Sequence, residues 1–120
     1  MAVAIATITW EFAVAWFPRR LEIEHYLGTT LLPGGEIRHV WPRDKAHWLR
    51  RLATDRGISG RRIAAVGDSA CDVDLLLAAP HTIYVGSNVP DRLPHAIHLP
   101  NDDILAIASR ILDRFGTPPQ

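Results

Sequence analysis

Two aspartates separated by three residues mark the part of this sequence most able to do chemistry. Asp68 follows a short apolar run that ends at Gly67, and Asp72 stands where an amphipathic helix is expected to begin. In an open α/β sheet, ligands bind beyond the carboxyl ends of the strands. Two carboxylates there would supply the oxygen ligands that Mg²⁺ prefers. The spacing is consistent with a metal site, although a turn aspartate and a helix N-cap would have the same spacing.

Two further polar residues stand where they could reach the same edge of a sheet. Thr7 lies at the end of the first predicted strand, and Lys45 lies in the first turn of a helix predicted over residues 42–56. A helix dipole disfavours a cation in the first turn, which favours a functional role for Lys45. A lysine is nevertheless most often solvated, a neighbour at i+4 could also explain it, and Thr9 competes with Thr7.

Strand patterns alternate with helix patterns along the whole chain. We predict buried strands over residues 2–6 and 63–66, and further strands over 23–27, 82–85 and 96–99. A β-hairpin is predicted to join 31–32 to 37–40 through Gly34 and Gly35. Helices are predicted over 10–17, ended or kinked by Pro18, over 42–56 and over 72–79. Asn101 is expected to cap a last helix whose inner face holds Ile104, Leu105, Ala108, Ile111, Leu112 and Phe115. The alternation predicts a three-layer α/β domain with a mostly parallel sheet covered on both faces.

The composition limits the classes of function. At 120 residues the chain is expected to form one domain, residues 1–120, and its 13 basic and 13 acidic side chains balance. Without a basic stripe we expect no nucleic-acid partner. The apolar start is too short to span a bilayer and lacks the features of a signal peptide, so no membrane role is expected. One cysteine, Cys71, interpreted as a packing residue, fits a reducing compartment and a cytoplasmic location.

The order of these motifs resembles the haloacid dehalogenase (HAD) superfamily, and within it the phosphoserine-phosphatase-like branch. The resemblance runs from about residue 4 to 112, and the segment GTTLLPGGEIRHV resembles a hairpin of that branch. It implies a Rossmann-like core and Mg²⁺-dependent hydrolysis of a small phosphorylated metabolite through an aspartyl-phosphate. On this template Asp68 binds Mg²⁺ directly, and Asp72 holds a metal-bound water or orients Lys45. Thr7 and Lys45 would be catalytic residues that bind the phosphate.

The sequence also departs from that family. The family's first motif, a strand followed by Asp-x-Asp that supplies the nucleophile, has no counterpart here, and neither does the helical cap. The one Asp-x-Asp, Asp72 to Asp74, falls inside a predicted helix, where its side chains diverge. In the family the missing strand lies between the Thr7 strand and the Asp68 strand.

Three expectations follow from these departures. The chain would correspond to the C-terminal two-thirds of the family fold. It would be an incomplete or inactive phosphatase on its own. It would also self-associate or require a complementing chain. The alternative is a non-catalytic HAD-like module that binds metal, phosphate or a protein partner.

Overall fold

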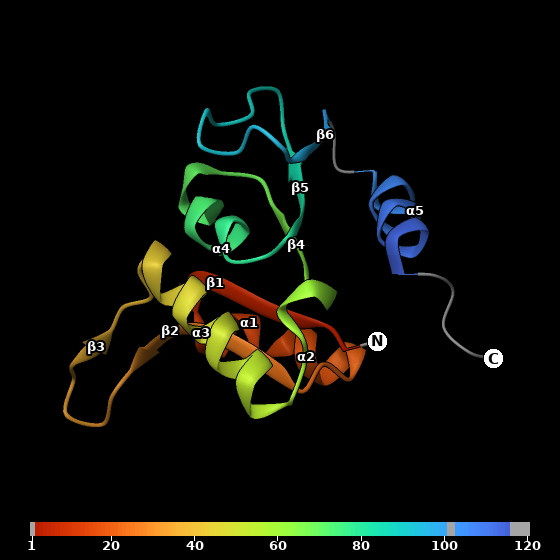
Figure 1. Cartoon of the computed structure of the whole chain (residues 1–120). Coiled ribbons are helices and arrows are strands. Elements are labelled where there is room, and N and C mark those ends of the chain that lie inside the picture. The colour runs from red at the N-terminus through yellow and green to blue at the C-terminus, as the bar shows by residue number, and fades with distance from the viewer. Residues whose placement is uncertain (1, 101–102, 116–120) are drawn as a thin grey trace.

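The computed structural model describes residues 2–100 and 103–115, with strands and helices that alternate as the sequence predicts (Figure 1). The elements in chain order are β1 (Ala4–Trp10), α1 (Glu11–Val14), α2 (Trp16–Leu21), β2 (His25–Leu31), β3 (Ile37–Arg38), α3 (Pro42–Asp55), the 3₁₀ turn η1 (Gly60–Arg62), β4 (Ala64–Gly67), the 3₁₀ turn η2 (Ala70–Asp72), α4 (Val73–Leu77), β5 (His81–Val85), β6 (Ile97–Leu99) and α5 (Ile104–Phe115). The α/β class is confirmed. Within the described residues, no helix is long and apolar enough to cross a membrane.

The strands form two separate three-stranded sheets. In the first, β1 pairs in parallel with β2, and β2 pairs with β3 in the predicted antiparallel hairpin. In the second, β4, β5 and β6 are parallel. Strands β1 and β4 each stand at an edge, and no backbone hydrogen bond joins them in the described part of the chain. The mostly parallel pairing is therefore confirmed, but the one predicted sheet is divided between β1, which contains Thr7, and β4, which precedes Asp68.

Helices connect the two sheets. Helix α3 contacts β1 of the first sheet and packs against α4, which covers the second sheet. The largest core cluster surrounds β4, α4 and β5 and consists of Ala65, Val73, Leu76, Ala79, Tyr84 and Leu93. Strand β1, predicted to be buried, is instead half-buried or exposed along its whole length, because its outer edge carries no neighbouring strand.

Local signals set most element ends. Helix α3 begins at Pro42, and the backbone N–H of Trp41 donates to the Asp44 carboxylate at 2.7 Å. Gly57 adopts a φ of 64° just after the helix, a conformation that favours glycine. The N-terminal helix differs from the prediction, since it divides at Ala15 and Pro18 lies inside α2.

The last helix is capped differently from the prediction. The Asp103 carboxylate accepts from the backbone N–H groups of Leu105 and Ala106, whereas Asn101 lies outside the described residues. Leu105 is 78% exposed and Ala108 is exposed, so the predicted inner face is wrong at both positions. The half-buried residues at its C-terminal end, Ile111, Leu112 and Phe115, agree with the prediction.

Candidate functional site

A cleft of about 580 Å³ lies between the middle of β1 and the end of β4, and the four predicted site residues all line it. Lys45 comes from the first turn of α3, Asp68 from the residue after β4, and Asp72 from the end of η2. Thr7 lies in the middle of β1, which continues to Trp10, so the prediction that it ends the first strand is wrong. The fold thus brings together side chains that are up to 65 positions apart in the sequence (from 7 to 72). Thr9, the competing candidate, is exposed and is not among the residues that line the cleft.

Lys45 and Asp72 form a buried ion pair at the base of the cleft. The Lys45 Nζ lies 2.7 Å from Asp72 Oδ1, and the two side chains are 5% and 12% exposed. The partner of Lys45 is therefore neither solvent nor a neighbour one turn along its own helix. A charge-assisted bond of this length fixes the ammonium in place. This geometry favours the second of the two predicted roles of Asp72, the orientation of Lys45.

The other carboxylate oxygen of Asp72 is also fully engaged. Asp72 Oδ2 accepts from the backbone N–H of Asp68 at 3.1 Å, and from the backbone N–H and hydroxyl of Ser69, both at 3.3 Å. Burial alone would raise the pKa of Asp72. The hydrogen bond from Lys45, the amide of Asp68, the charge of Lys45 and the amide of Ser69 oppose this effect, and the pKa is lowered below its usual value.

Gly67 makes this arrangement sterically possible. A Cβ at position 67 would lie 2.5 Å from the Cβ of Asp72 and 3.1 Å from its Oδ2, closer than side-chain atoms can approach. The last residue of β4 must therefore lack a side chain for the Asp72 carboxylate to reach the amides of Asp68 and Ser69. The glycine was interpreted from sequence only as the end of a strand.

Asp68 is the carboxylate best placed to take a metal ion. Its side chain is exposed and, in the described part of the chain, accepts no hydrogen bond and forms no ion pair. The described residues include no group of three or more His, Cys, Asp or Glu that could hold a metal. Mg²⁺ commonly binds through one or two carboxylates together with waters and substrate phosphates. A single free carboxylate beside an anion site fits that mode of binding.

The Thr7 hydroxyl is available as a donor. Thr7 Oγ1 accepts from the backbone N–H of Thr9 at 3.1 Å, which leaves its own proton free. A residue that sequence reasoning missed, Thr29, binds the part of β1 next to Thr7. Its buried hydroxyl donates to the carbonyl of Ile8 at 2.6 Å and accepts from the N–H of Val40 at 3.1 Å. Nothing in the pattern of a strand threonine indicates these two long-range bonds.

Cys71 corrects a smaller prediction. It was expected to be a packing residue, but it is exposed and lines the cleft. It follows Ser69, whose hydroxyl accepts from the Cys71 N–H at 3.3 Å and caps η2. The turn from β4 into α4 is thus held by Ser69 and Asp72, and Cys71 plays no part in the core.

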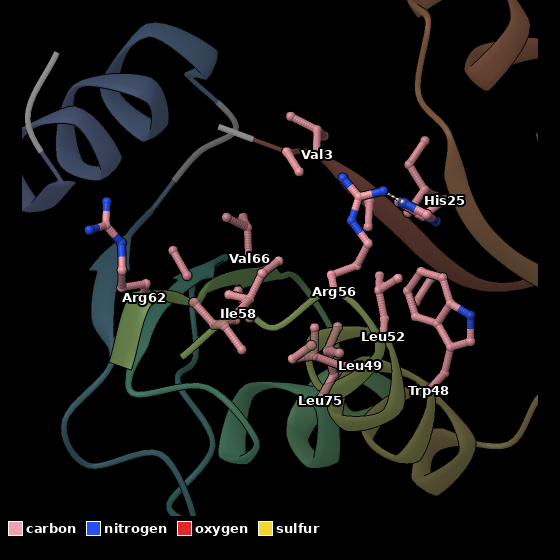
Figure 2. A pocket seen from close by; sticks show the side chains of 18 of the residues that line it. Val3, His25, Trp48, Leu49, Leu52, Arg56, Ile58, Arg62, Val66 and Leu75 are labelled. Carbon is pink, nitrogen blue, oxygen red and sulfur yellow. Dashed lines mark hydrogen bonds between the residues drawn. The ribbon is translucent and has the colours of Figure 1, made fainter. Parts of the chain in front are cut away.

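A second and larger hollow, of about 740 Å³, continues from the cleft between β1 and β4. We call it the interstrand groove; it runs along residues 2–6 on one side and 62–66 on the other. Figure 2 shows Leu49, Leu52 and Trp48 of α3 directed toward it. The cleft and the groove share Ile5, Ala6, Val66 and Asp72, so they are two parts of one opening between the sheets.

Several solved structures similar to this chain are phosphatases, and one is a HAD family hydrolase. The chain matches an unliganded probable phosphoserine phosphatase from Vibrio cholerae with a TM-score of 0.77 and 22% identity, over 98% of this chain and 40% of that one. It matches a HAD family hydrolase from Salmonella enterica serovar Typhi with a TM-score of 0.73 and 18% identity, over 87% and 39% of the two chains. A cobalt-bound deoxy-D-mannose-octulosonate 8-phosphate phosphatase from Haemophilus influenzae matches with a TM-score of 0.67 and 16% identity, over 96% and 63%.

These matches confirm the fold that the sequence motifs imply. The chain has a Rossmann-like α/β fold similar to the cores of these solved structures, and it spans between about two-fifths and two-thirds of their length. No family model matches the chain, and no curated protein matches it significantly. At identities of 16–22% the likeness concerns the fold, and the activity must be argued from the site.

Proposed function

We propose that this chain is the phosphate-binding and metal-binding part of a Mg²⁺-dependent phosphomonoester hydrolase of the HAD type, acting on a small phosphorylated metabolite. The observation that supports this best is the meeting of Thr7, Lys45, Asp68 and Asp72 in one cleft between β1 and the end of β4. Hydroxyl, ammonium and carboxylate groups are the set that phosphoryl transfer requires for positioning and charge stabilisation.

Each side chain then has a distinct part in binding the phosphate. Lys45, held by Asp72, presents a fixed positive charge, and the free proton of Thr7 can be donated to a phosphate oxygen. Asp68 would hold Mg²⁺, which when bound neutralises charge on the phosphoryl group. In the described part of the cleft the carboxylates are Asp68 and Asp72, and both are assigned to these roles. Covalent turnover needs an additional nucleophile, so we expect binding of phosphate with little or no turnover by this chain alone.

Calorimetric titration with inorganic phosphate, with and without Mg²⁺, tests this function. We expect phosphate to bind with a millimolar Kd in the presence of Mg²⁺ and at least tenfold more weakly without it. Lys45→Met and Asp68→Asn should each weaken binding at least tenfold. Asp74→Asn is the matched control, because Asp74 lies outside the cleft and its carboxylate pairs with Arg92 at 3.5 Å.

Two results would contradict the proposed function. One is phosphate binding that Asp74→Asn weakens as much as Asp68→Asn does. The other is rapid hydrolysis of an aryl phosphate by the purified chain with Asp68→Asn as active as the unchanged protein. Circular dichroism of each variant separates a loss of binding from a loss of folding.

A further inference from the structure

Strand β1 departs from regular pairing with β2 at the point where Thr7 lies. The pairing is regular up to Ala6 and is found again at Trp10, so residues 7–9 of β1 stand opposite the single residue Gly28 of β2. We call residues 7–9 the β1 bulge. Extra residues in one strand redirect side chains, and such irregularities often lie beside functional sites. Because Thr7 lines the cleft, the position of its hydroxyl depends on what holds the β1 bulge in place.

The hydroxyl of Thr29 holds the middle of the β1 bulge. It donates to the carbonyl oxygen of Ile8 at 2.6 Å, and Thr29 is only 4% exposed, so the bond is shielded from competing water. Gly28 allows the bulge to lie this close to β2, because a Cβ at Gly28 would be 3.0 Å from the carbonyl oxygen of Thr9. The bulge therefore depends on two neighbouring residues of β2, one without a side chain and one with a hydroxyl.

The same hydroxyl reaches the chain that leads into helix α3. The Thr29 oxygen accepts from the backbone N–H of Val40 at 3.1 Å, and Val40 is buried. Val40 lies two residues before Pro42, where α3 begins, and Lys45 is in the first turn of that helix. A hydroxyl can donate one hydrogen bond while it accepts another, so both bonds form together. One buried oxygen thus connects the β1 bulge to the start of α3.

This connection joins the two groups proposed to bind the phosphate. Lys45 is held on its other side by Asp72 at 2.7 Å. Among the described residues, the Thr7 hydroxyl bonds with the N–H of Thr9, which belongs to the same bulge. The placement of Thr7 relative to Lys45 therefore depends on the backbone of the bulge, and Thr29 bonds that backbone to the start of α3. Small displacements of groups that hold a reacting phosphate have large effects on binding and turnover.

We propose that Thr29 is a positioning residue of the phosphate site. Its hydroxyl holds the β1 bulge against the start of α3 and so keeps the Thr7 hydroxyl in one orientation relative to Lys45. Thr29 does not line the cleft and acts through Thr7. The inference rests on the proposed function, in which Thr7 and Lys45 bind the phosphate. A purely structural role would instead lower stability and leave the affinity of the folded protein for phosphate unchanged.

Three variants separate these roles in an NMR titration with inorganic phosphate and Mg²⁺. Thr29→Val removes the hydroxyl and retains the shape, and it should weaken phosphate binding about tenfold, the contribution of one hydrogen bond to a charged group. Thr29→Ser retains the hydroxyl and should bind within about threefold of the unchanged protein. Thr30→Val is the matched control, because the Thr30 hydroxyl, also in β2, donates to the Glu11 carboxylate at 2.7 Å. It should weaken binding less than twofold, and equal weakening by Thr29→Val and Thr30→Val would overturn the proposal.

A double-mutant cycle tests whether Thr29 acts through Thr7. Thr29→Val is measured in the unchanged protein and in a Thr7→Val background. Its effect on the phosphate Kd should fall below about twofold in that background, because the contact that it supports is already absent. Equal weakening in both backgrounds would show that Thr29 does not act through Thr7 and would overturn the proposal.

A measurement without phosphate keeps this inference separate from the proposed function. Three-bond NMR couplings to the methyl carbon of Thr7 report its χ1 rotamer in the free protein. We expect one rotamer in the unchanged protein and in Thr29→Ser, and averaged couplings in Thr29→Val, with each variant folded by circular dichroism. Thr29→Ala replaces the valine variant if that variant does not fold. If the unchanged protein binds no phosphate, the proposed function fails and the couplings alone decide. A single Thr7 rotamer in a folded variant without the hydroxyl overturns the inference in either case.

Discussion

Breaking the buried pair of Lys45 and Asp72 should have unequal effects that depend on which partner is changed. Asp72 receives four donors on two oxygens: Lys45 on Oδ1, and the Asp68 amide with the Ser69 amide and hydroxyl on Oδ2. Asparagine offers a single acceptor oxygen. In Asp72→Asn, either the buried ammonium or the backbone amides lose their acceptor, and the ammonium also loses its counter-charge.

The magnitude follows from the burial of the two side chains. Removing one partner of a buried ion pair costs about 3–5 kcal/mol, and Lys45 is 4% exposed as a residue. We expect this loss for Asp72→Asn. Lys45→Met leaves the three donors on Asp72 Oδ2 in place, so the remaining carboxylate keeps partners and a smaller loss of about 1–3 kcal/mol is expected. The double variant should lose less than the sum of the single losses, because the asparagine oxygen then serves only the backbone donors.

Urea unfolding at pH 7 and 25 °C, followed by circular dichroism, measures these differences. A small domain has a total stability of about 5–15 kcal/mol, so the Asp72→Asn midpoint should fall sharply. Asp74→Asn, which removes a partly exposed pair with Arg92, should change stability by about 0–1 kcal/mol. A loss below about 1 kcal/mol for Asp72→Asn, or a larger loss for Lys45→Met than for Asp72→Asn, would refute this account of the pair.

Three further predictions concern the same region. Because folding lowers the pKa of Asp72, the unfolded chain binds more protons than the folded chain near pH 4 and below. The free energy of unfolding should therefore fall on acidification through this range, and it should fall less steeply in Asp72→Asn. Urea midpoints measured from pH 2 to 6 test this. Gly67→Ala should displace the Asp72 carboxylate and cost about 1–3 kcal/mol; a thermal midpoint equal to that of the unchanged protein would contradict this. Thr29→Val removes the side-chain partner of the Ile8 carbonyl and the Val40 amide, so it should lower the free energy of unfolding by about 1–3 kcal/mol and lower the thermal midpoint. Thr54→Val is the control, because Thr54 lies at an exposed helical position; it should change the thermal midpoint little.

The sequence predicts elements well where local signals set their ends. Helix α3 is within one residue of its predicted range because Pro42 and Gly57 act through their own backbone geometry. Pro18 shows the limit of this reasoning. It lies in the first turn of α2, where a backbone N–H would have no helical partner, so its missing donor does not end the helix there.

Glycines show the same limit in the strands. The second strand was predicted to end before Gly28, yet β2 continues to Leu31. A Cβ at Gly28 would lie 2.9 Å from the Cα of Glu11, so this glycine permits the start of α1 to pack against the strand. Such a close approach depends on a segment 17 positions away (from 11 to 28), and no local pattern encodes it.

The candidate site was predictable as a set of residues and not as a set of contacts. Thr7, Lys45, Asp68 and Asp72 all reach one cleft, because Asp68 follows the carboxyl end of β4 and Thr7 comes directly after the point in β1 where regular pairing with β2 is interrupted. The choice between metal ligand and lysine partner for Asp72 depends on which donors face each of its oxygens. That information comes from the turn after β4, where Gly67 and Ser69 let the carboxylate fold back on the backbone.

The same ion pair explains how the two sheets remain together although their edge strands are unpaired. Lys45 belongs to α3, which packs on β1, and Asp72 belongs to η2, which leads from β4 into α4. The pair and the contact of α3 with α4 therefore connect the two sheets through their helices, beside the interstrand groove and not across it.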